Sequence, residues 1–190
     1  MRDKDNKNRE DLGWCVERAL LDLMKEKPFG EILIKEILRK SGVSKDFFYR
    51  RFKTKEAVAE SCITGIFEGM GPIEIPGRSI TEAAESDLDC LLANRETLLP
   101  LHKNGLTGFL QPLIRKRAEQ RLAPYIDRSR LTFQAEHSIA AHASALCELV
   151  KIWLDYGMEQ SPKELMEITG LAHVREEYLQ GFAGPFWRAG

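Results

Sequence analysis

Apolar residues along most of the chain recur at intervals of three and four positions, which is the spacing of one face of an α-helix. Val16, Leu20 and Leu23 show this spacing first and predict a helix over about residues 10–26. The segment 27–30, Lys-Pro-Phe-Gly, interrupts the pattern, because proline cannot continue a helix and glycine suits a turn. The first predicted helix therefore ends before this segment.

Three further helices are predicted over about 32–40, 45–52 and 55–68. The Ser-Gly-Val sequence at 41–43 ends the first of these after about two turns. Ser44 and Thr54 stand immediately before the other two, where a side-chain hydroxyl can accept a hydrogen bond from a free backbone N–H. No alternating pattern typical of a β-strand occurs in this part of the sequence.

The pattern changes at residues 69–77, which contain three Gly and two Pro and predict a connector. Pro112 lies inside the helix expected over about 107–122, so that helix is expected to be kinked or to begin later than residue 107. We predict an all-α fold with an N-terminal domain over 1–68, a linker over 69–79 and a C-terminal helical domain over 80–190. The later helices are expected over about 80–93, 96–104, 107–122, 130–157, 162–169 and 171–181.

The composition is that of an ordinary globular protein. The 190 residues are 43% hydrophobic and 30% charged, with a net charge of −1. No apolar run approaches the ~20 residues needed to span a bilayer, and the charged N-terminus has no signal-peptide pattern, so we expect a cytoplasmic protein. The four cysteines match no zinc or redox spacing and are read as structural thiols: Cys15, Cys62, Cys90 and Cys147.

The charge is unevenly distributed. Residues 39–55 contain seven Lys and Arg against one acid, Asp46. A local basic patch on a nearly neutral protein is typical of a surface that contacts nucleic acid, although a solvated helix face is an equally compatible interpretation. The patch coincides with two short helices joined by a turn at Gly42, and this combination predicts a helix-turn-helix motif. Such a motif places its second helix in the major groove of DNA.

The same residues resemble the DNA-binding region of TetR-type regulators over about positions 10–60. The resemblance rests on Lys27-Pro28-Phe29, Ile34, Ile37, Ser41-Gly42-Val43-Ser44-Lys45, Phe48-Tyr49, Phe52 and Lys55-Glu56-Ala57-Val58. Three positions differ from the family pattern. Leu33 replaces a capping Thr or Ser that binds a phosphate, Leu38 replaces an Ala between the helices, and Phe47 replaces a small or hydroxylated residue.

The resemblance implies a role for each residue around the second helix of the motif. Ser44 would cap it, Lys45 and Asp46 would face base edges, and Arg50 would reach a base edge or a phosphate. Phe48 and Phe52 are expected in the core. The full set of implied DNA-binding residues is Ser44, Lys45, Asp46, Phe47, Tyr49, Arg50, Arg51, Lys53 and Lys55, of which Tyr49, Arg51, Lys53 and Lys55 would bind phosphates.

For the C-terminal domain, the resemblance implies a homodimer and a pocket for a small-molecule effector. The expected function is a transcriptional repressor that binds double-stranded DNA at a palindromic operator and is released by its effector. The alternative is a TetR-fold interaction protein that has lost operator recognition. No enzyme motif occurs, and we expect no cofactor and no metal. Candidate pocket residues are Phe109, Tyr125, Phe133, His137, Trp153 and Tyr156, which are also compatible with plain core positions.

Overall fold

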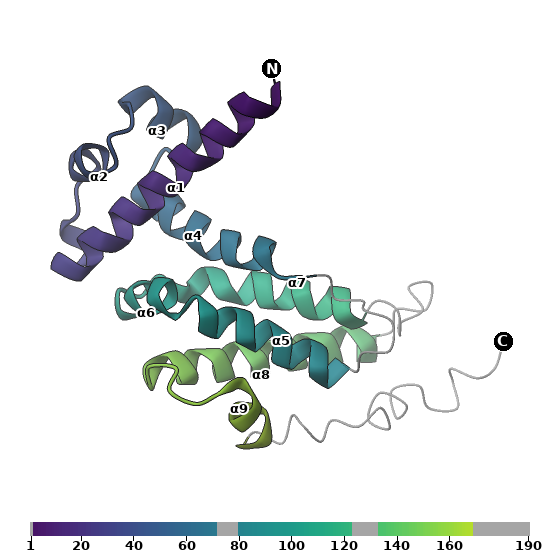
Figure 1. Ribbon diagram of the computed structural model, residues 1–190. Coiled ribbons are helices and arrows are strands. Elements are labelled where there is room, and N and C mark those ends of the chain that lie inside the picture. The colour runs from purple at the N-terminus through teal and green to yellow at the C-terminus, as the bar shows by residue number, and fades with distance from the viewer. Residues whose placement is uncertain (1, 72–79, 123–132, 169–190) are drawn as a thin grey trace. The chain divides into compact units, whose positions relative to one another are not determined.

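The computed structural model describes residues 2–71, 80–122 and 133–168 (Figure 1). Within these ranges the regular elements are α-helices and two short 3-10 helices, which confirms the predicted all-α class. None of the described helices is long and apolar enough to cross a membrane. The chain divides into two compact units, one formed by Met1–Gly69 and Asn94–Leu110, the other by Met70–Ala93 and Gln111–Gly190.

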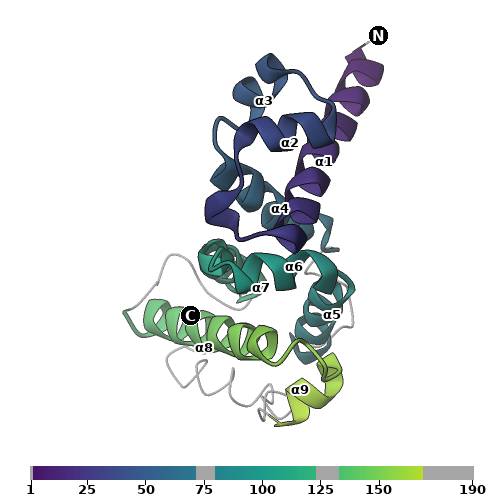
Figure 2. The ribbon, with the colours of Figure 1, turned by 90° about the vertical axis from the view of Figure 1, so that its left-hand side faces the viewer.

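The first unit contains the predicted helix-turn-helix region (Figure 2). Its core side chains come from every major helix and include Leu20, Ile37, Phe48 and Ile63, each fully buried. Helix α1 begins earlier than predicted. The prediction missed its first turns because they are polar and carry no apolar periodicity. The elements of this unit are α1 (Arg2–Glu26), η1 (Phe29–Glu31), α2 (Ile34–Ser41), α3 (Lys45–Arg51), α4 (Lys55–Gly69), α6 (Arg95–Lys103) and η2 (Thr107–Phe109).

Helix α6 belongs to this unit although it follows α5 in the sequence. Leu98 and Leu101 of α6 are fully buried, and the helix packs against α1 and α4. The domain prediction places this segment in the C-terminal region, whereas the compact unit includes it. Amphipathic spacing within a helix gives its buried face but does not indicate which domain covers that face.

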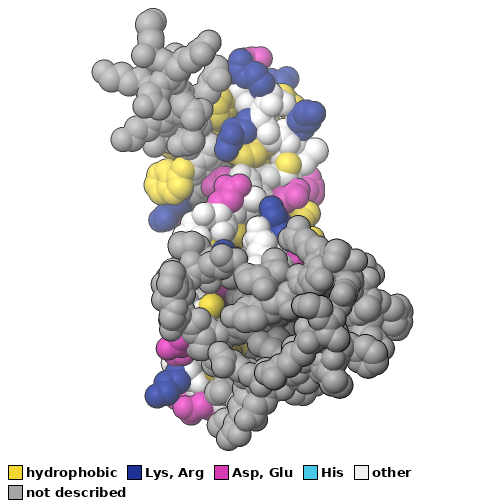
Figure 3. All heavy atoms as spheres, turned by 90° about the vertical axis from the view of Figure 1, so that its right-hand side faces the viewer, with side chains coloured by type: hydrophobic (Ala, Val, Ile, Leu, Met, Phe, Trp, Pro, Cys, Tyr) yellow, Lys and Arg dark blue, Asp and Glu magenta, His cyan; other side chains and the backbone are white. Residues whose placement is uncertain are grey.

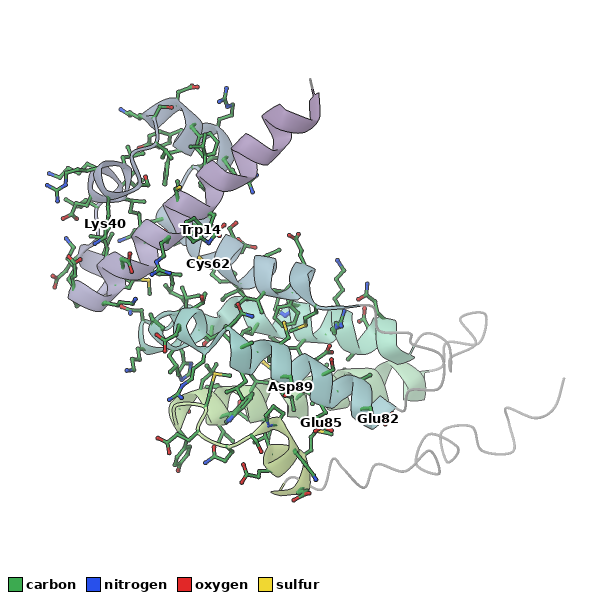
Figure 4. All side chains as sticks on the ribbon, viewed as in Figure 1. Trp14, Lys40, Cys62, Glu82, Glu85 and Asp89 are labelled. Carbon is green, nitrogen blue, oxygen red and sulfur yellow. The ribbon has the colours of Figure 1, made fainter. Side chains whose placement is uncertain are left out.

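The second unit consists of α5 (Ile80–Ala93), most of α7 (Leu110–Leu122), α8 (Phe133–Asp155) and α9 (Pro162–Ile168). Helices α5 and α9 pack together. Figure 4 shows Glu82, Glu85 and Asp89 along α5. A half-buried ion pair joins α7 to α5, with Arg117 Nη2 2.7 Å from Asp87 Oδ1, and the same nitrogen donates to the Gly71 carbonyl at 2.7 Å.

Prolines lie in the first turns of α7 and α9. Pro112 lies in the first turn of α7, where its missing N–H has no helical partner to lose. Pro162 is the first residue of α9, and Ser161 Oγ accepts a hydrogen bond from the Glu164 backbone N–H at 3.3 Å. The predicted helix over 171–181 lies outside the described residues.

Candidate nucleic-acid interface

The turn between α2 and α3 has the backbone geometry of a helix-turn-helix motif. Gly42 closes α2 with φ +71°, a left-handed conformation that costs glycine little, and its N–H donates to the Leu38 carbonyl at 3.0 Å. Ser44 then caps α3, because its Oγ accepts a hydrogen bond from the Phe47 N–H at 3.1 Å. These two local contacts set where α2 stops and α3 starts.

The inner side of α3 is anchored by aromatic side chains. Phe48 is fully buried and Phe52 is 5% exposed, with their ring centroids 5.9 Å apart, so both occupy the core as predicted. Val43 and Ile37 are also buried beside the turn. Phe47 is 8% exposed and is a core residue, in place of the predicted position close to DNA. A phenylalanine ring gains more from burial than from exposure, which explains the difference.

The outer side of α3 carries four exposed side chains, Lys45, Asp46, Tyr49 and Arg50. They form two pairs that are each four residues apart and therefore lie along the same side of the helix. Lys45 Nζ is 5.8 Å from the centroid of the Tyr49 ring. Arg50 Nη1 is 3.5 Å from Asp46 Oδ2, with side chains 64% and 83% exposed. This face is available to a partner molecule.

Arg51, the last residue of α3, and Lys53, which follows the helix, extend the exposed basic surface. The Arg51 guanidinium lies 5.5 Å from the Phe52 ring centroid, and a Cβ atom at position 13 would be 3.0 Å from Arg51 Nε. Gly13 on α1 thus leaves room for the arginine. Lys53 adopts φ +70°, which a non-glycine residue rarely does. Among the described side chains visible in Figure 3, Lys and Arg are interspersed with Asp and Glu.

Lys55 has a different environment from the other predicted DNA contacts. Its Nζ donates to three backbone carbonyls of the η1 turn, at 2.7 Å to Phe29, 3.0 Å to Ile32 and 3.2 Å to Gly30. Nζ also lies 4.5 Å from the centroid of the Phe29 ring. An ammonium group has three N–H donors, so all three have acceptors within the protein. The structure therefore assigns Lys55 to holding this turn, in place of the predicted phosphate contact.

Leu33, which replaces a capping Thr or Ser, stands at the N-cap of α2 and is 51% exposed. Its side chain cannot accept a hydrogen bond, but Glu36 Oε2 accepts one from the Leu33 N–H at 2.9 Å. Lys27 Nζ donates to the same carboxylate at 2.7 Å. Both bonds lower the pKa of Glu36, and the bond from Lys27 has the larger effect. Glu36 thus supplies the reciprocal hydrogen bond of a capping box, while the side-chain cap itself is missing at Leu33.

Sequence reasoning missed one residue that supports the motif. Asn104, at the end of α6, accepts a hydrogen bond at Oδ1 from the Phe29 N–H at 2.8 Å, while its Nδ2 donates to the Pro100 carbonyl at 2.9 Å. Phe29 is therefore held through its N–H by Asn104 and through its carbonyl by Lys55. No local pattern could have signalled this contact, because 75 positions separate the partners.

The predicted pocket residues that the structure describes lie in different environments. Trp153 is 1% exposed, and its Nε1 donates to the Gln160 carbonyl at 3.1 Å, which identifies it as a core residue of the second unit. Tyr156 is 71% exposed and His137 is also exposed, so neither lines the interior of this unit. Phe109 is half-buried and belongs to η2 of the first unit. Tyr125 and the Phe133 side chain lie outside the described residues.

Two further properties of the described residues are metal binding and thiol reactivity. No group of three or more His, Cys, Asp or Glu in the described part of the chain could hold a metal ion. Cys62 is buried in α4 (labelled in Figure 4), and burial raises the pKa of its thiol far above the usual range. A thiol of this kind is a poor nucleophile and packs as a small apolar side chain.

Comparison with protein families decides the identity of the helix-turn-helix region. Residues 18–62 match the model of the bacterial regulatory proteins of the tetR family. The chain carries the DNA-binding region of a TetR-family regulator. The matched segment runs from within α1 to within α4 and includes η1, α2 and α3, so it covers the capped turn and the exposed face of α3. No curated protein and no solved structure matches the chain. The family match supports a TetR-like DNA-binding transcriptional regulator.

Proposed function

We propose that this regulator is a repressor that binds a palindromic operator as a homodimer and leaves it when a small molecule binds. The observation that carries the proposal is the exposed face of α3, with Lys45, Asp46, Tyr49 and Arg50 outside and Phe48 and Phe52 anchored inside. A helix held in this way can enter a major groove without losing its own packing.

Dimer formation has a physical reason. Helix α3 has seven residues, so one copy offers few contacts to DNA, and a single small module binds weakly. Two copies related by a twofold axis would place two α3 helices about one turn of DNA apart, on the two halves of a palindrome. The proposed effector would act by binding one spacing of these helices more tightly than another.

The experiment is a titration of the full chain with its own upstream promoter DNA at several salt concentrations. We expect saturable binding that weakens steeply with salt, because cationic side chains release counterions from the phosphates. The test variant is Lys45→Ala/Arg50→Ala. The matched control is Arg115→Ala/Lys116→Ala on α7, where both residues are exposed and Arg115 forms an i,i+4 ion pair with Glu119.

Loss of binding in the α3 variant and its retention in the α7 control would support the proposal. Equal binding by both variants, or no binding by the folded wild-type chain at low salt, would contradict it. Reporter expression from the same promoter, with and without the gene for the regulator, separates repression from activation. Sedimentation of the protein with and without operator DNA measures the number of copies bound.

One observation favours a second candidate function. Leu33 exposes half of an apolar side chain at the start of α2, where the family pattern has a group that binds a phosphate. An apolar group at this position suits a protein partner, so the alternative is a regulator that binds another protein and no longer recognises an operator. Leu33→Thr separates the two, since it strengthens DNA binding under the first function and weakens partner binding under the second.

A further inference from the structure

Asp46 is an unusual residue for a surface that meets DNA. Residues 39–55 contain seven Lys and Arg, and Asp46 is the single acid in this segment. Its side chain is 83% exposed. A carboxylate close to phosphates is repelled by their charge. On the exposed face of a DNA-binding helix, Asp46 is favourable where it meets hydrogen-bond donors, and in the major groove the donors are the amino groups of cytosine and adenine.

Arg50 has the complementary chemistry and lies next to Asp46. A guanidinium is donor-only and forms two parallel hydrogen bonds with O6 and N7 of guanine, whereas a carboxylate is acceptor-only and suits N4 of cytosine. A G·C pair presents both partners on one major-groove edge. The 3.5 Å separation of Arg50 Nη1 from Asp46 Oδ2 places a donor group and an acceptor group side by side on one helix face.

The contact between the two residues leaves them available for DNA. At 3.5 Å and with more than 60% of each side chain exposed, the ion pair is weak, because water competes for both charges. Beneath them α3 is held in place by the Ser44 cap and by buried Phe48. The side chains can therefore adjust while the backbone that carries them stays in position.

We propose that Asp46 and Arg50 together read a G·C pair in each half of the operator, with Arg50 on guanine and Asp46 on the amino group of cytosine. This inference rests on the proposed operator binding and adds the residues that determine its specificity. Asp46 has a second effect: its charge weakens binding to DNA of any sequence, so that the correct base pair is needed to offset the repulsion.

The experiment selects preferred sequences from duplexes with randomised positions, using full-length wild type and the variants Arg50→Ala, Arg50→Lys, Asp46→Ala and Asp46→Asn. For wild type we expect one G·C position in each half-site. Arg50→Ala should lose the guanine preference by about 5- to 150-fold, and Arg50→Lys should lose part of it while keeping the charge. Arg115→Ala/Lys116→Ala on α7 is the control, because both residues are exposed outside the proposed DNA-binding face and their loss should leave the preference for this base pair in place.

The two Asp46 variants separate base reading from a structural role. Asp46→Ala should lose the discrimination at cytosine and bind non-specific DNA more tightly than wild type. Asp46→Asn should shift the preference from cytosine toward adenine, because an amide pairs with N6 and N7 of adenine. A residue with a merely structural role would lower the affinity for all sequences equally.

The outcomes are distinguishable. Wild type that selects no G·C position, or Asp46 and Arg50 variants that retain the wild-type preference, would overturn this inference and leave operator binding intact. Wild type that binds no duplex at all would overturn the proposed function as well. A selective change at the G·C position in both sets of variants would establish the assignment.

Discussion

Replacing Lys55 with Met tests the conclusion that this residue holds the η1 turn. Methionine keeps an unbranched apolar chain of similar length but removes the ammonium group. The change eliminates the hydrogen bonds to the carbonyls of Phe29, Ile32 and Gly30, and the approach of Nζ to the Phe29 ring. The backbone that loses these bonds connects α1 to α2, so the effect should reach the helix-turn-helix motif.

The magnitude follows from the environment of each bond. A hydrogen bond to a charged group contributes about 1.5–3 kcal/mol, and the contact of an exposed ammonium with an aromatic ring about 0.5–1 kcal/mol. The bonds to Phe29 and Ile32 are partly buried, whereas the Gly30 carbonyl is exposed and can bind water after the substitution. We expect a loss of about 2–4 kcal/mol in unfolding free energy, or a fall in Tm of about 5–15 °C.

The assay measures thermal unfolding by circular dichroism and DNA affinity as a function of salt, with Lys45→Met as the matched control. Lys45 is exposed on α3, so its substitution should change the unfolding free energy by less than about 0.5 kcal/mol. A lysine that neutralises a phosphate contributes about 0.9 to the slope of log affinity against log salt. Lys55→Met should keep the wild-type slope. A Tm equal to that of wild type together with a reduced slope would show that Lys55 binds a phosphate and would refute the reasoning.

Three further predictions concern the caps and the core. Ser44→Ala should lower the unfolding free energy by about 1 kcal/mol, measured by denaturant unfolding, and Ser44→Thr should retain most of the cap. Burial raises the pKa of Glu17, although the 2.6 Å hydrogen bond from Ser61 Oγ and the charge of Arg51 oppose the shift. The native state therefore holds this proton to higher pH than the unfolded state does, so its contribution to stability falls as pH rises from the unfolded to the folded pKa. Glu17→Gln should be more stable than wild type at neutral pH and equal to it in acid, and wild-type superiority at neutral pH would contradict this. Trp153→Phe should cost about 1–3 kcal/mol, because the Gln160 carbonyl loses its donor in a partly buried site; an unchanged Tm would show that water replaces it.

Helices were largely predictable from the sequence because their signals are local. The Gly42 stop and the Ser44 cap of α3 depend on residues within four positions, and the structure has both where the pattern places them. The burial of Phe48 and Phe52 agrees with what the resemblance to the family implied. Phe47 was the exception on α3. A third aromatic residue in this short helix could face either side, and only the packed unit shows that it is buried.

The sequence by itself determined that the fold is all-α, roughly where α2, α3 and α4 begin and end, and that a basic helix-turn-helix region lies near the N-terminus. These properties depend on periodicity, caps and charge within a few turns of helix. The tertiary structure alone decided that Lys55 binds η1 carbonyls, that Asn104 holds the Phe29 N–H, and that α6 belongs to the first unit. Each of these contacts joins residues more than twenty positions apart. A donor finds its acceptor there only after the helices have packed, so no local pattern encodes the pairing.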